Sequence, residues 1–496
     1  MARSSTPSFV LTLKMNTTVR QDQILNKRFF IGFQMYNKLV THAEKRINAL
    51  NCDKEYRLLL QERHTLVSSE KTDKKSVNKI NHRLKDIRLA YGMSEYQFHA
   101  WISVQQNRYK EHIDSLTAQK IASKVWQAVD KYLFDNGKAV HYRRFDEFLS
   151  LEGKNNLSGI RFKKDHIEWN GLKIPVQIRK KDLYAQEALS HRVKYCRIVR
   201  KPVGTRYQYY VQLILEGIPP KKHEYLESGR VGIDPGVSTE AVVSENGCIL
   251  TEIAPDRKNI TRRVTKLQRK MDRSRRTSNP DNYNPDGTIV TCPHKFKKSK
   301  TYRRDQMRLA SLRRRNAAYV RQQEEILSNR ILCEHGSDIF TEDMNYKALQ
   351  ARTKETSVSE KTGRYKRKKR FGASLSKHAP ARFLSVLERK LGYIGKTLNR
   401  VNTAQYRASQ YDHVSDAYEK VSLSTRSKTI AGHLIQRDLY SAFLLMCAES
   451  PDKPDRDLCE VEFPAFIENH DICINELLKD SDNKLSSFGL KDFAAV

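Results

Sequence analysis

Three acidic residues lie within otherwise apolar segments of the C-terminal half, and they constrain the fold more than any other feature of the sequence. Asp234 follows the apolar run Val231–Ile233 and precedes Pro235–Gly236. Glu342 ends the run DIFTE, and Asp438 lies in the helical apolar stretch IQRDLYSAFLLM. A carboxylate at a buried position is costly unless it is paired or binds a metal ion. We therefore expect a fold that gives these residues a common polar site.

Three carboxylates that converge from two strands and a helix form a site for Mg²⁺, which keeps waters or phosphate oxygens as its other ligands. Two such ions, about 3.5–4 Å apart, activate a water and stabilise the leaving oxygen of a phosphodiester. Each residue also has a structural interpretation. Asp234 fits a turn, and Asp438 fits a surface pair with Arg437. Glu342 and Asp343 fit the cap of a following helix. Spacing alone leaves both interpretations open.

The chain carries a large excess of positive charge, with 91 Lys and Arg against 57 Asp and Glu and a net charge of +34. A protein this basic either pairs with a polyanion, most commonly nucleic acid, or repels itself. The densest basic runs are 261–276, 294–315 and 363–370, whereas 450–496 forms an acidic C-terminal tail. The predicted nucleic-acid contacts are Arg262, Arg263, Lys266, Arg269, Lys270, Arg273, Arg275, Arg276, Arg364, Lys366, Arg367, Lys368, Lys369 and Arg370.

Several protein classes are excluded by what the sequence lacks. No stretch approaches the roughly 18 consecutive apolar residues of a membrane span, so we expect neither an integral membrane protein nor a membrane partner. The first 15 residues lack the apolar core of a secretory signal. The eight cysteines are scattered without close pairs, as in reduced cytosolic proteins. These features predict a cytoplasmic protein, associated with the bacterial nucleoid when it is bound to DNA.

The N-terminal half combines strand and helix patterns. Residues 8–15 alternate apolar and polar side chains, which predicts a strand. Apolar residues then recur at spacings of four and three from Phe29 to Leu50, and helical periodicity extends over 19–135. Asn170–Gly171 predicts a hairpin turn, and a second hairpin flanks 202–205. We expect a small antiparallel barrel or sheet that includes the N-terminal strand, with the helices inserted after that strand.

Strand and helix patterns alternate over about 220 residues from Arg230 onward, which predicts an α/β domain. The expected strands lie within 231–250, at DIFTE and near 398–403. The expected helices lie at 304–333, around 381–392 and around 432–447.

Several of these segments match known motifs. VGIDPGVSTEAVVS resembles the first RuvC motif of the transposon-encoded TnpB nucleases and the compact type V CRISPR effectors. DIFTEDMNYKALQ is similar to their second motif, IQRDLYSAF lies where their third motif lies, and KHAPARFLSVLERKL resembles the helix between them. The match covers about 229–447. The N-terminal half resembles the family only in its order of strand, helical block and barrel.

This resemblance implies a multidomain α+β protein. Its implied parts are a wedge-like β-barrel (1–18 and 136–228), a helical recognition domain (19–135), an RNase H-like (RuvC) α/β nuclease domain (229–404 and 431–449), a reduced target-strand-loading lobe (405–430) and the tail (450–496). Asp234, Glu342 and Asp438 are implied as the catalytic residues and the ligands of Mg²⁺, with two ions. The implied activity is RNA-guided cleavage of DNA. Its partners are a guide RNA, transposon-derived or CRISPR, and a double-stranded DNA target with a short flanking motif.

One departure from the family concerns zinc. Family members usually carry paired CxxC motifs between the second and third RuvC motifs, where they form a zinc ribbon. Here no cysteine lies between Cys333 and Cys447. His413 alone cannot hold a structural zinc, which needs four ligands. We therefore expect no zinc and a metal-free version of the lobe at 405–430.

Three alternative functions remain. One is a nuclease-inactive relative that binds DNA under RNA guidance and represses transcription; the acidic residues at all three motifs argue against it. Another is a basic RNA-binding scaffold without catalysis, in which the carboxylates are structural. The last is a guide-independent resolvase or transposase, which does not need so long an N-terminal half.

Overall fold

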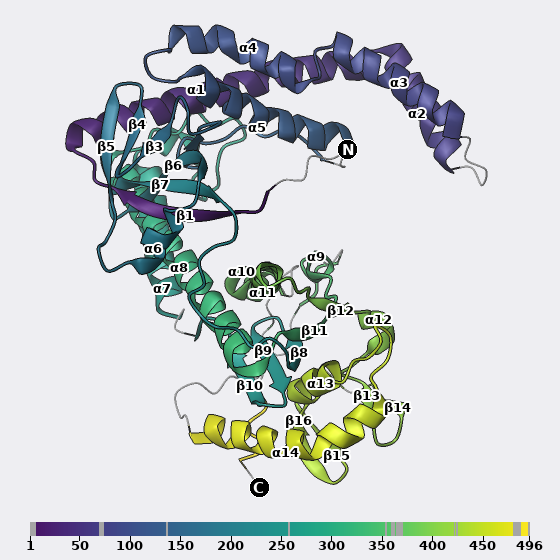
Figure 1. The fold of residues 1–496 in the computed structure, drawn as a ribbon. Coiled ribbons are helices and arrows are strands. Elements are labelled where there is room, and N and C mark those ends of the chain that lie inside the picture. Colours follow the sequence, from purple (N-terminus) through teal and green to yellow (C-terminus); the bar gives the residue numbers. More distant parts are fainter. Residues whose placement is uncertain are drawn as a thin grey trace. The chain divides into compact units, whose positions relative to one another are not determined.

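The structure is a computed structural model (Figure 1). It describes residues 6–68, 74–134, 137–255, 258–352, 355–358, 363, 371–420, 422, 425–479 and 488–494. The chain divides into two compact units, Met1–Pro220 and Lys221–Val496, so the border falls slightly before the predicted one at 228–229. No helix among the described residues is long and apolar enough to cross a bilayer.

The first unit contains one antiparallel sheet of seven strands, in the order β2-β6-β7-β1-β5-β4-β3. The strands are β1 (Ser8–Met15), β2 (Ser150–Glu152), β3 (Arg161–Lys163), β4 (His166–Trp169), β5 (Leu172–Gln177), β6 (Val193–Val203) and β7 (Arg206–Glu216). Strand β1 pairs with both β5 and β7, so the N-terminal strand completes a sheet made from residues far along the chain.

Two hairpins of this sheet follow from their turn residues. Asn170 and Gly171 both have positive φ, 39° and 74°, as the two-residue turn between β4 and β5 requires. The second hairpin differs from the prediction. Pro202 and Val203 belong to β6, where Pro202 pairs with Tyr207, and the turn is only Gly204–Thr205.

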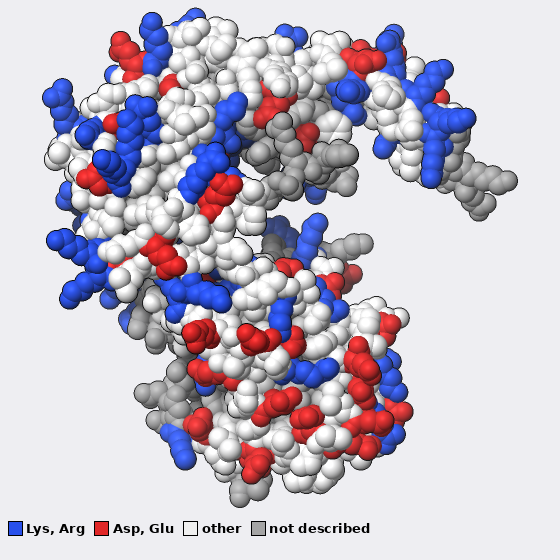
Figure 2. Space-filling model, viewed as in Figure 1, with Lys and Arg blue, Asp and Glu red and all other residues white. Residues whose placement is uncertain are grey.

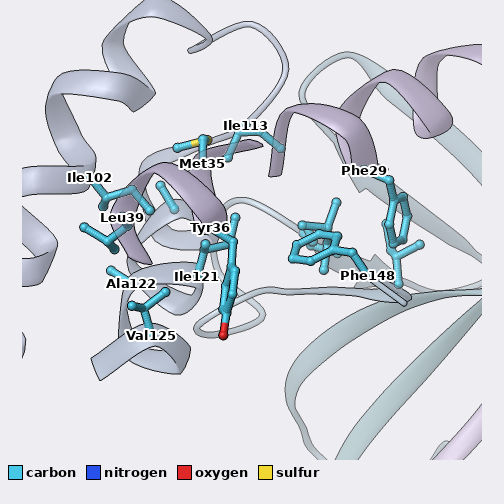
Figure 3. Close-up of a cluster of buried hydrophobic side chains, with 14 of the residues drawn as sticks. Phe29, Met35, Tyr36, Leu39, Ile102, Ile113, Ile121, Ala122, Val125 and Phe148 are labelled. Carbon is cyan, nitrogen blue, oxygen red and sulfur yellow. The ribbon is translucent and has the colours of Figure 1, made fainter. Parts of the chain in front are cut away.

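A block of helices separates β1 from β2 in the chain. It consists of α1 (Val19–Cys52), α2 (Lys54–Ser68), α3 (Lys74–Ala90), α4 (Glu95–Arg108) and α5 (Ser115–Phe134), and α6 (Leu183–Ala188) follows β5. Figure 3 shows the buried cluster where α1, α4 and α5 meet: Met35, Tyr36 and Leu39 of α1 lie with Ile102 of α4 and Val125 of α5. The apolar face predicted for α1 therefore packs inward.

A buried arginine also fixes α1 to the sheet. Arg28 donates hydrogen bonds to the carbonyl oxygens of Trp169 (2.8 Å) and Asn170 (2.7 Å), and its guanidinium lies 4.4 Å from the centre of the Trp169 ring. Because burial lowers the pKa of Arg28 to about 10, these contacts offset only part of the cost of desolvation.

The second unit is built on a five-stranded sheet of order β10-β9-β8-β11-β12. Its strands are β8 (Arg230–Pro235), β9 (Thr239–Ser244), β10 (Gly247–Glu252), β11 (Asp338–Glu342) and β12 (Asn399–Val401). The pairs β8–β9 and β9–β10 are antiparallel, whereas β8–β11 and β11–β12 are parallel. The smaller strands β13 (Tyr411–Asp412), β14 (Ala417–Tyr418), β15 (Ser427–Ile430) and β16 (His433–Gln436) form two hairpins.

Helices cover both faces of this sheet. The second-unit helices are α7 (Lys258–Thr277), α8 (Lys300–Arg330), α9 (Tyr346–Leu349), α10 (Gly372–His378), α11 (Pro380–Tyr393), α12 (Thr403–Tyr406), α13 (Arg437–Met446) and α14 (Arg456–Lys479), with short turns at Pro280–Asn282 and Ile331–His335. One core joins Ala241 and Val243 to α13 and α14, and another joins Ile233 and Ile339 to α8 and α11. The sheet is therefore buried on both sides, as in α/β domains.

Two predictions about the C-terminal region need correction. The helix expected around 432–447 begins only at Arg437, because His433–Gln436 forms β16 and pairs with β15. The acidic tail is not an extension from the domain: α14 buries Phe466 and Ile474 in the core of the second unit. Apolar residues at helical spacing among the acidic ones explain why it packs there.

Candidate active site

Asp234 and Glu342 end adjacent parallel strands. Thr341 of β11 lies opposite Ile233 of β8, so the next residues along the two strands, Glu342 and Asp234, are also neighbours. Side chains alternate between the two faces of a strand. Ile233 faces α8 and α11, so Asp234 faces α13 instead. The carboxyl ends of adjacent parallel strands are a common position for ligand sites in such sheets.

A glycine lets α13 approach this edge of the sheet. A Cβ atom on Gly232 would lie 1.8 Å from the carbonyl oxygen of Ala442 and 2.4 Å from the backbone nitrogen of Met446. Helix α13 therefore crosses directly over β8 with backbone against backbone. Asp438 lies in the first turn of that helix. The structure thus brings all three predicted residues to one end of the sheet.

Burial disfavours the ionisation of both strand carboxylates. Burial raises the pKa of Asp234 well above its usual value, and the charges of Glu342 and Asp438 raise it further. Burial also raises the pKa of Glu342, to about 7. Neither carboxylate has a hydrogen bond or an ion pair with any residue in the described part of the chain. A bound cation is the kind of partner that reverses such shifts.

Asp438 has a different environment, because two arginines pair with it. Its Oδ1 lies 3.0 Å from Nη2 of Arg437, and its Oδ2 lies 3.5 Å from Nη1 of Arg426.

Within the described ranges, no group of three or more His, Cys, Asp or Glu side chains is arranged to hold a metal ion. The pair of Asp438 with Arg437 considered from the sequence is present, but it is not a surface pair, because both side chains are largely buried. Asp438 also acts electrostatically on Asp234.

The donor set fits a hard divalent cation. Asp234 and Glu342 offer only carboxylate oxygens, and both are half-buried without an ion pair to any described residue. The nearby charge of Arg437 lowers the pKa of Asp234, but burial has the larger, opposite effect. Mg²⁺ prefers oxygen ligands and needs only one or two protein carboxylates, since water or phosphate completes its shell. These two residues can hold such an ion, and Asp438 can contribute once it is separated from its arginines.

A shallow hollow of about 610 Å³ lies beyond the ends of β11 and β12. Its lining includes Asp343, which follows Glu342, together with Arg400, Asn402 and Thr403. Arg400 lies 3.6 Å from Asp343 and is partly exposed. Arg400 lies opposite Thr341 in the β11–β12 register, so its side chain is on the other face of the sheet from Glu342, and there it also approaches Glu388 at 3.7 Å.

The predicted basic contacts divide into two groups on α7. Arg262, Lys266, Arg269 and Arg273 recur at spacings of four, three and four, so they share one helix face. All four are exposed, and none has an ion pair with any described residue. We call these four residues the cationic stripe. Arg263, also exposed, lies beside it.

The other predicted contacts on α7 already have partners. Lys270 pairs with the buried Asp305 at 3.1 Å, and Arg275 and Arg276 pair with Asp272 at 2.8 and 2.9 Å. In the run 363–370 the structure describes only Gly363. The predicted contacts Arg364, Lys366, Arg367, Lys368, Lys369 and Arg370 therefore lie outside the described residues.

Sequence reasoning missed two charged residues near the site. Glu240 on β9 is fully buried, and neither of its carboxylate oxygens has a partner among the described residues. Its signal was an acidic residue inside the strand pattern STEAVVS. Arg426, which contacts Asp438, had no sequence signal, because the pairing depends on the β15–β16 hairpin.

Comparisons with known proteins gave matches only among solved structures. No protein-family model matches the chain, and neither does any curated protein. The chain is similar to a Cas12f1–sgRNA–target DNA complex, with 11% identity and a TM-score of 0.41, over 88% of this chain and 98% of that one. It is also similar to a CRISPR-Cas12f ternary complex, with 12% identity and a TM-score of 0.23, over 89% of this chain and 99% of that one.

Proposed function

We propose that this protein is an RNA-guided DNA endonuclease. It binds a structured guide RNA, recognises a short motif beside the target, forms an RNA–DNA heteroduplex and cleaves DNA at a single RuvC-type site. The observation that carries the proposal is the placement of Asp234 and Glu342 on adjacent parallel strands beneath the helix that bears Asp438. The order of the five strands, with helices on both faces, supports an RNase H-like domain.

The proposed reaction is Mg²⁺-dependent phosphodiester hydrolysis, in which Asp234 and Glu342, with Asp438, hold the metal. When bound, Mg²⁺ supplies Lewis-acid stabilisation of the phosphate and activation of water. The chain's own residues set the site for this. Asp234 and Glu342 face α13 from the carboxyl ends of two inner strands. Because their pKa values are raised, a bound cation would stabilise their ionised forms.

The proposed partners are a guide RNA and a DNA target, the classes of nucleic acid present in the Cas12f1 complex. The net charge of +34 supports a polyanionic partner. The cationic stripe gives this charge a defined, exposed position on α7. In such complexes base pairing reads the sequence, while the protein contacts the backbone.

Single substitutions test the catalytic assignment. The assay uses the copurified RNA or a synthetic guide. Asp234→Ala, Glu342→Ala and Asp438→Ala should each lower plasmid cleavage by more than about 100-fold. Residues that only contact a metal ligand, and not the metal, usually cost less than this when they are replaced. RNA-guided DNA binding should persist, because the basic surface is unchanged. Glu245→Gln, which removes an exposed carboxylate from the turn between β9 and β10, is the matched control. Cleavage near the wild-type rate in any of the three alanine variants would refute that residue's role.

The second candidate is an RNA-guided DNA-binding protein without nuclease activity. The pairing of Asp438 with Arg426 and Arg437 favours it, since that pairing engages both carboxylate oxygens. The two candidates differ in one measurement on the wild-type protein. Guide-dependent binding to a matched DNA, with no cleavage at any Mg²⁺ concentration, would select the second.

A further inference from the structure

Helix α14 follows the three acidic motifs in the chain and contains a fully buried histidine, His470. Its Nε2 lies 3.0 Å from the backbone nitrogen of Gln436. The backbone nitrogen carries a hydrogen, so Nε2 must accept. The other ring nitrogen, Nδ1, lies 2.9 Å from Oδ1 of Asp471 and donates to it. These two contacts fix a single neutral tautomer of His470.

Gln436 is the residue through which α14 reaches the candidate active site. It is fully buried, ends β16 and caps the N-terminus of α13, where its side-chain oxygen accepts a hydrogen bond from the backbone nitrogen of Leu439 at 2.7 Å. In the sequence, Asp438 lies between Gln436, which caps the helix, and Leu439, whose backbone nitrogen binds the Gln436 side chain. His470 therefore holds the main chain at the point where α13 begins, two residues before Asp438.

Other contacts keep α14 and the residues after it fixed against the same region. The ring of Phe466 stacks on that of Phe443 in α13, with centres 4.5 Å apart. Ser427, opposite Gln436 in the β15–β16 hairpin, donates a hydrogen bond to Asp492 at 2.7 Å. A histidine on a firmly packed helix can therefore set the position of the Gln436 main chain.

We infer that His470 is a positioning residue for Asp438, and that it acts by accepting the hydrogen bond of the Gln436 main chain. Through this contact, helix α14 supports the position of Asp438 in the proposed nuclease site. This inference rests on the proposed function. Outer partners of this kind, which orient metal ligands without touching the metal, typically affect metal affinity or activity by about 10- to 100-fold.

Two amide variants separate positioning from simple packing. In His470→Gln the side-chain oxygen reaches the place of Nε2 and can accept from Gln436. In His470→Asn the side chain ends near the place of Nδ1 and leaves the Gln436 nitrogen without its acceptor. Both variants replace an aromatic ring by an amide, so both lose similar packing. Only the second removes the hydrogen bond.

The first measurement needs neither metal nor nucleic acid. Hydrogen exchange of the peptide that contains Gln436 should be at least about tenfold faster in His470→Asn than in the wild type. A tenfold change corresponds to a decrease of about 1.4 kcal/mol in the free energy of the local opening that exposes the Gln436 amide. In His470→Gln it should stay near the wild-type rate. Equal exchange in the two variants would overturn the inference, whatever the activity of the protein.

The second measurement is the Mg²⁺ dependence of guided cleavage. His470→Asn should need about 10- to 100-fold more Mg²⁺ for half-maximal rate or lose that factor in rate, while His470→Gln should largely restore it. RNA and DNA affinity should be unchanged. If the two variants have the same Mg²⁺ dependence, the positioning role is wrong even though the protein is a nuclease. If the wild type never cleaves, the proposed function fails, and the exchange measurement alone decides whether His470 holds Gln436.

Discussion

At the scale of single residues, Gly232 determines how closely α13 can approach strand β8. Its substitution by alanine places a Cβ atom 1.8 Å from the Ala442 carbonyl oxygen, and backbone atoms cannot yield as a flexible side chain does. We expect Gly232→Ala to lower the free energy of unfolding by about 3 kcal/mol, the upper range for overpacking, and to impair cleavage by displacing Asp438.

Chemical denaturation measures this, with Gly392→Ala as the control. Gly392 lies in α11 with open space around its Cβ position. Its substitution should be neutral or stabilise by up to about 1 kcal/mol. Equal stability of Gly232→Ala and the wild type would contradict the close crossing of α13 over β8.

Glu240 gives a pH-dependent prediction at the same scale. Burial raises its pKa well above the usual value, and Asp234 and Glu324 raise it further. The folded protein then keeps a proton that the unfolded chain loses above pH 4.5, so the free energy of unfolding falls as pH rises beyond that value. Glu240→Gln removes this dependence. Its melting temperature should exceed that of the wild type at pH 7.5, and the gain should shrink toward pH 5.

Thermal scans across this range provide the measurement. The exposed Glu245→Gln variant should stay within about 0.5 kcal/mol of the wild type, as surface substitutions usually do. A stability gain for Glu240→Gln that is the same at every pH would show that packing, not ionisation, limits this position.

At the scale of elements, the cationic stripe of α7 makes the nucleic-acid prediction specific. Replacing Arg262, Lys266, Arg269 and Arg273 by glutamine should weaken nucleic-acid binding for all sequences. For each phosphate contact that is lost, the slope of log K against log salt should flatten by about 0.7–0.9. Preference for the guide-matched target should persist, because base pairing supplies it.

The matched control replaces Arg275 and Arg276, which lie on the same helix but pair with Asp272. Binding is measured by fluorescence anisotropy at several salt concentrations. For each charge removed, the slope of log K against log salt should change less in this double variant than in the stripe variant. If the stripe variant kept the wild-type affinity and slope, the stripe would be only a solvated helix face.

The elements themselves could be read largely from the sequence where a pattern had one physical cause. The alternation in β1, the apolar face of α1 and the Asn170–Gly171 turn each follow from local periodicity or from φ requirements. The start of α13 could not be read this way. IQRDLYSAFLLM fits a helix throughout, and only pairing with β15 makes its first residues a strand. For the same reason, the pairing of Asp438 with Arg426 was visible only in the fold, whereas its neighbour Arg437 was a candidate partner from the sequence.

At the scale of the whole molecule, the charge is unevenly distributed over the sequence and the surface. On the face shown in Figure 2, acidic side chains gather over the C-terminal elements of the second unit, and basic side chains predominate over the first unit. Exposed basic side chains attract a polyanion and exposed acidic ones repel it, and both effects fall off within about 10 Å at 0.1 M salt. Binding should therefore depend on the basic surfaces and leave the acidic C-terminal elements outside the contact.

The nucleic acid that copurifies with the intact chain tests whether the protein binds a guide RNA through its basic surfaces. A net charge of +34 favours the retention of RNA at low salt. A complex with 6–10 phosphate contacts loses about 10³–10⁵ in affinity between 50 and 200 mM salt. We expect RNA that stays bound at 50 mM salt, leaves at high salt and, when sequenced, consists mainly of one structured species. Mixed cellular RNA would instead favour the scaffold function, because a scaffold held by charge alone selects no sequence. Little or no RNA would favour a guide-independent nuclease, and adding back the eluted species should restore DNA binding only if it is the guide.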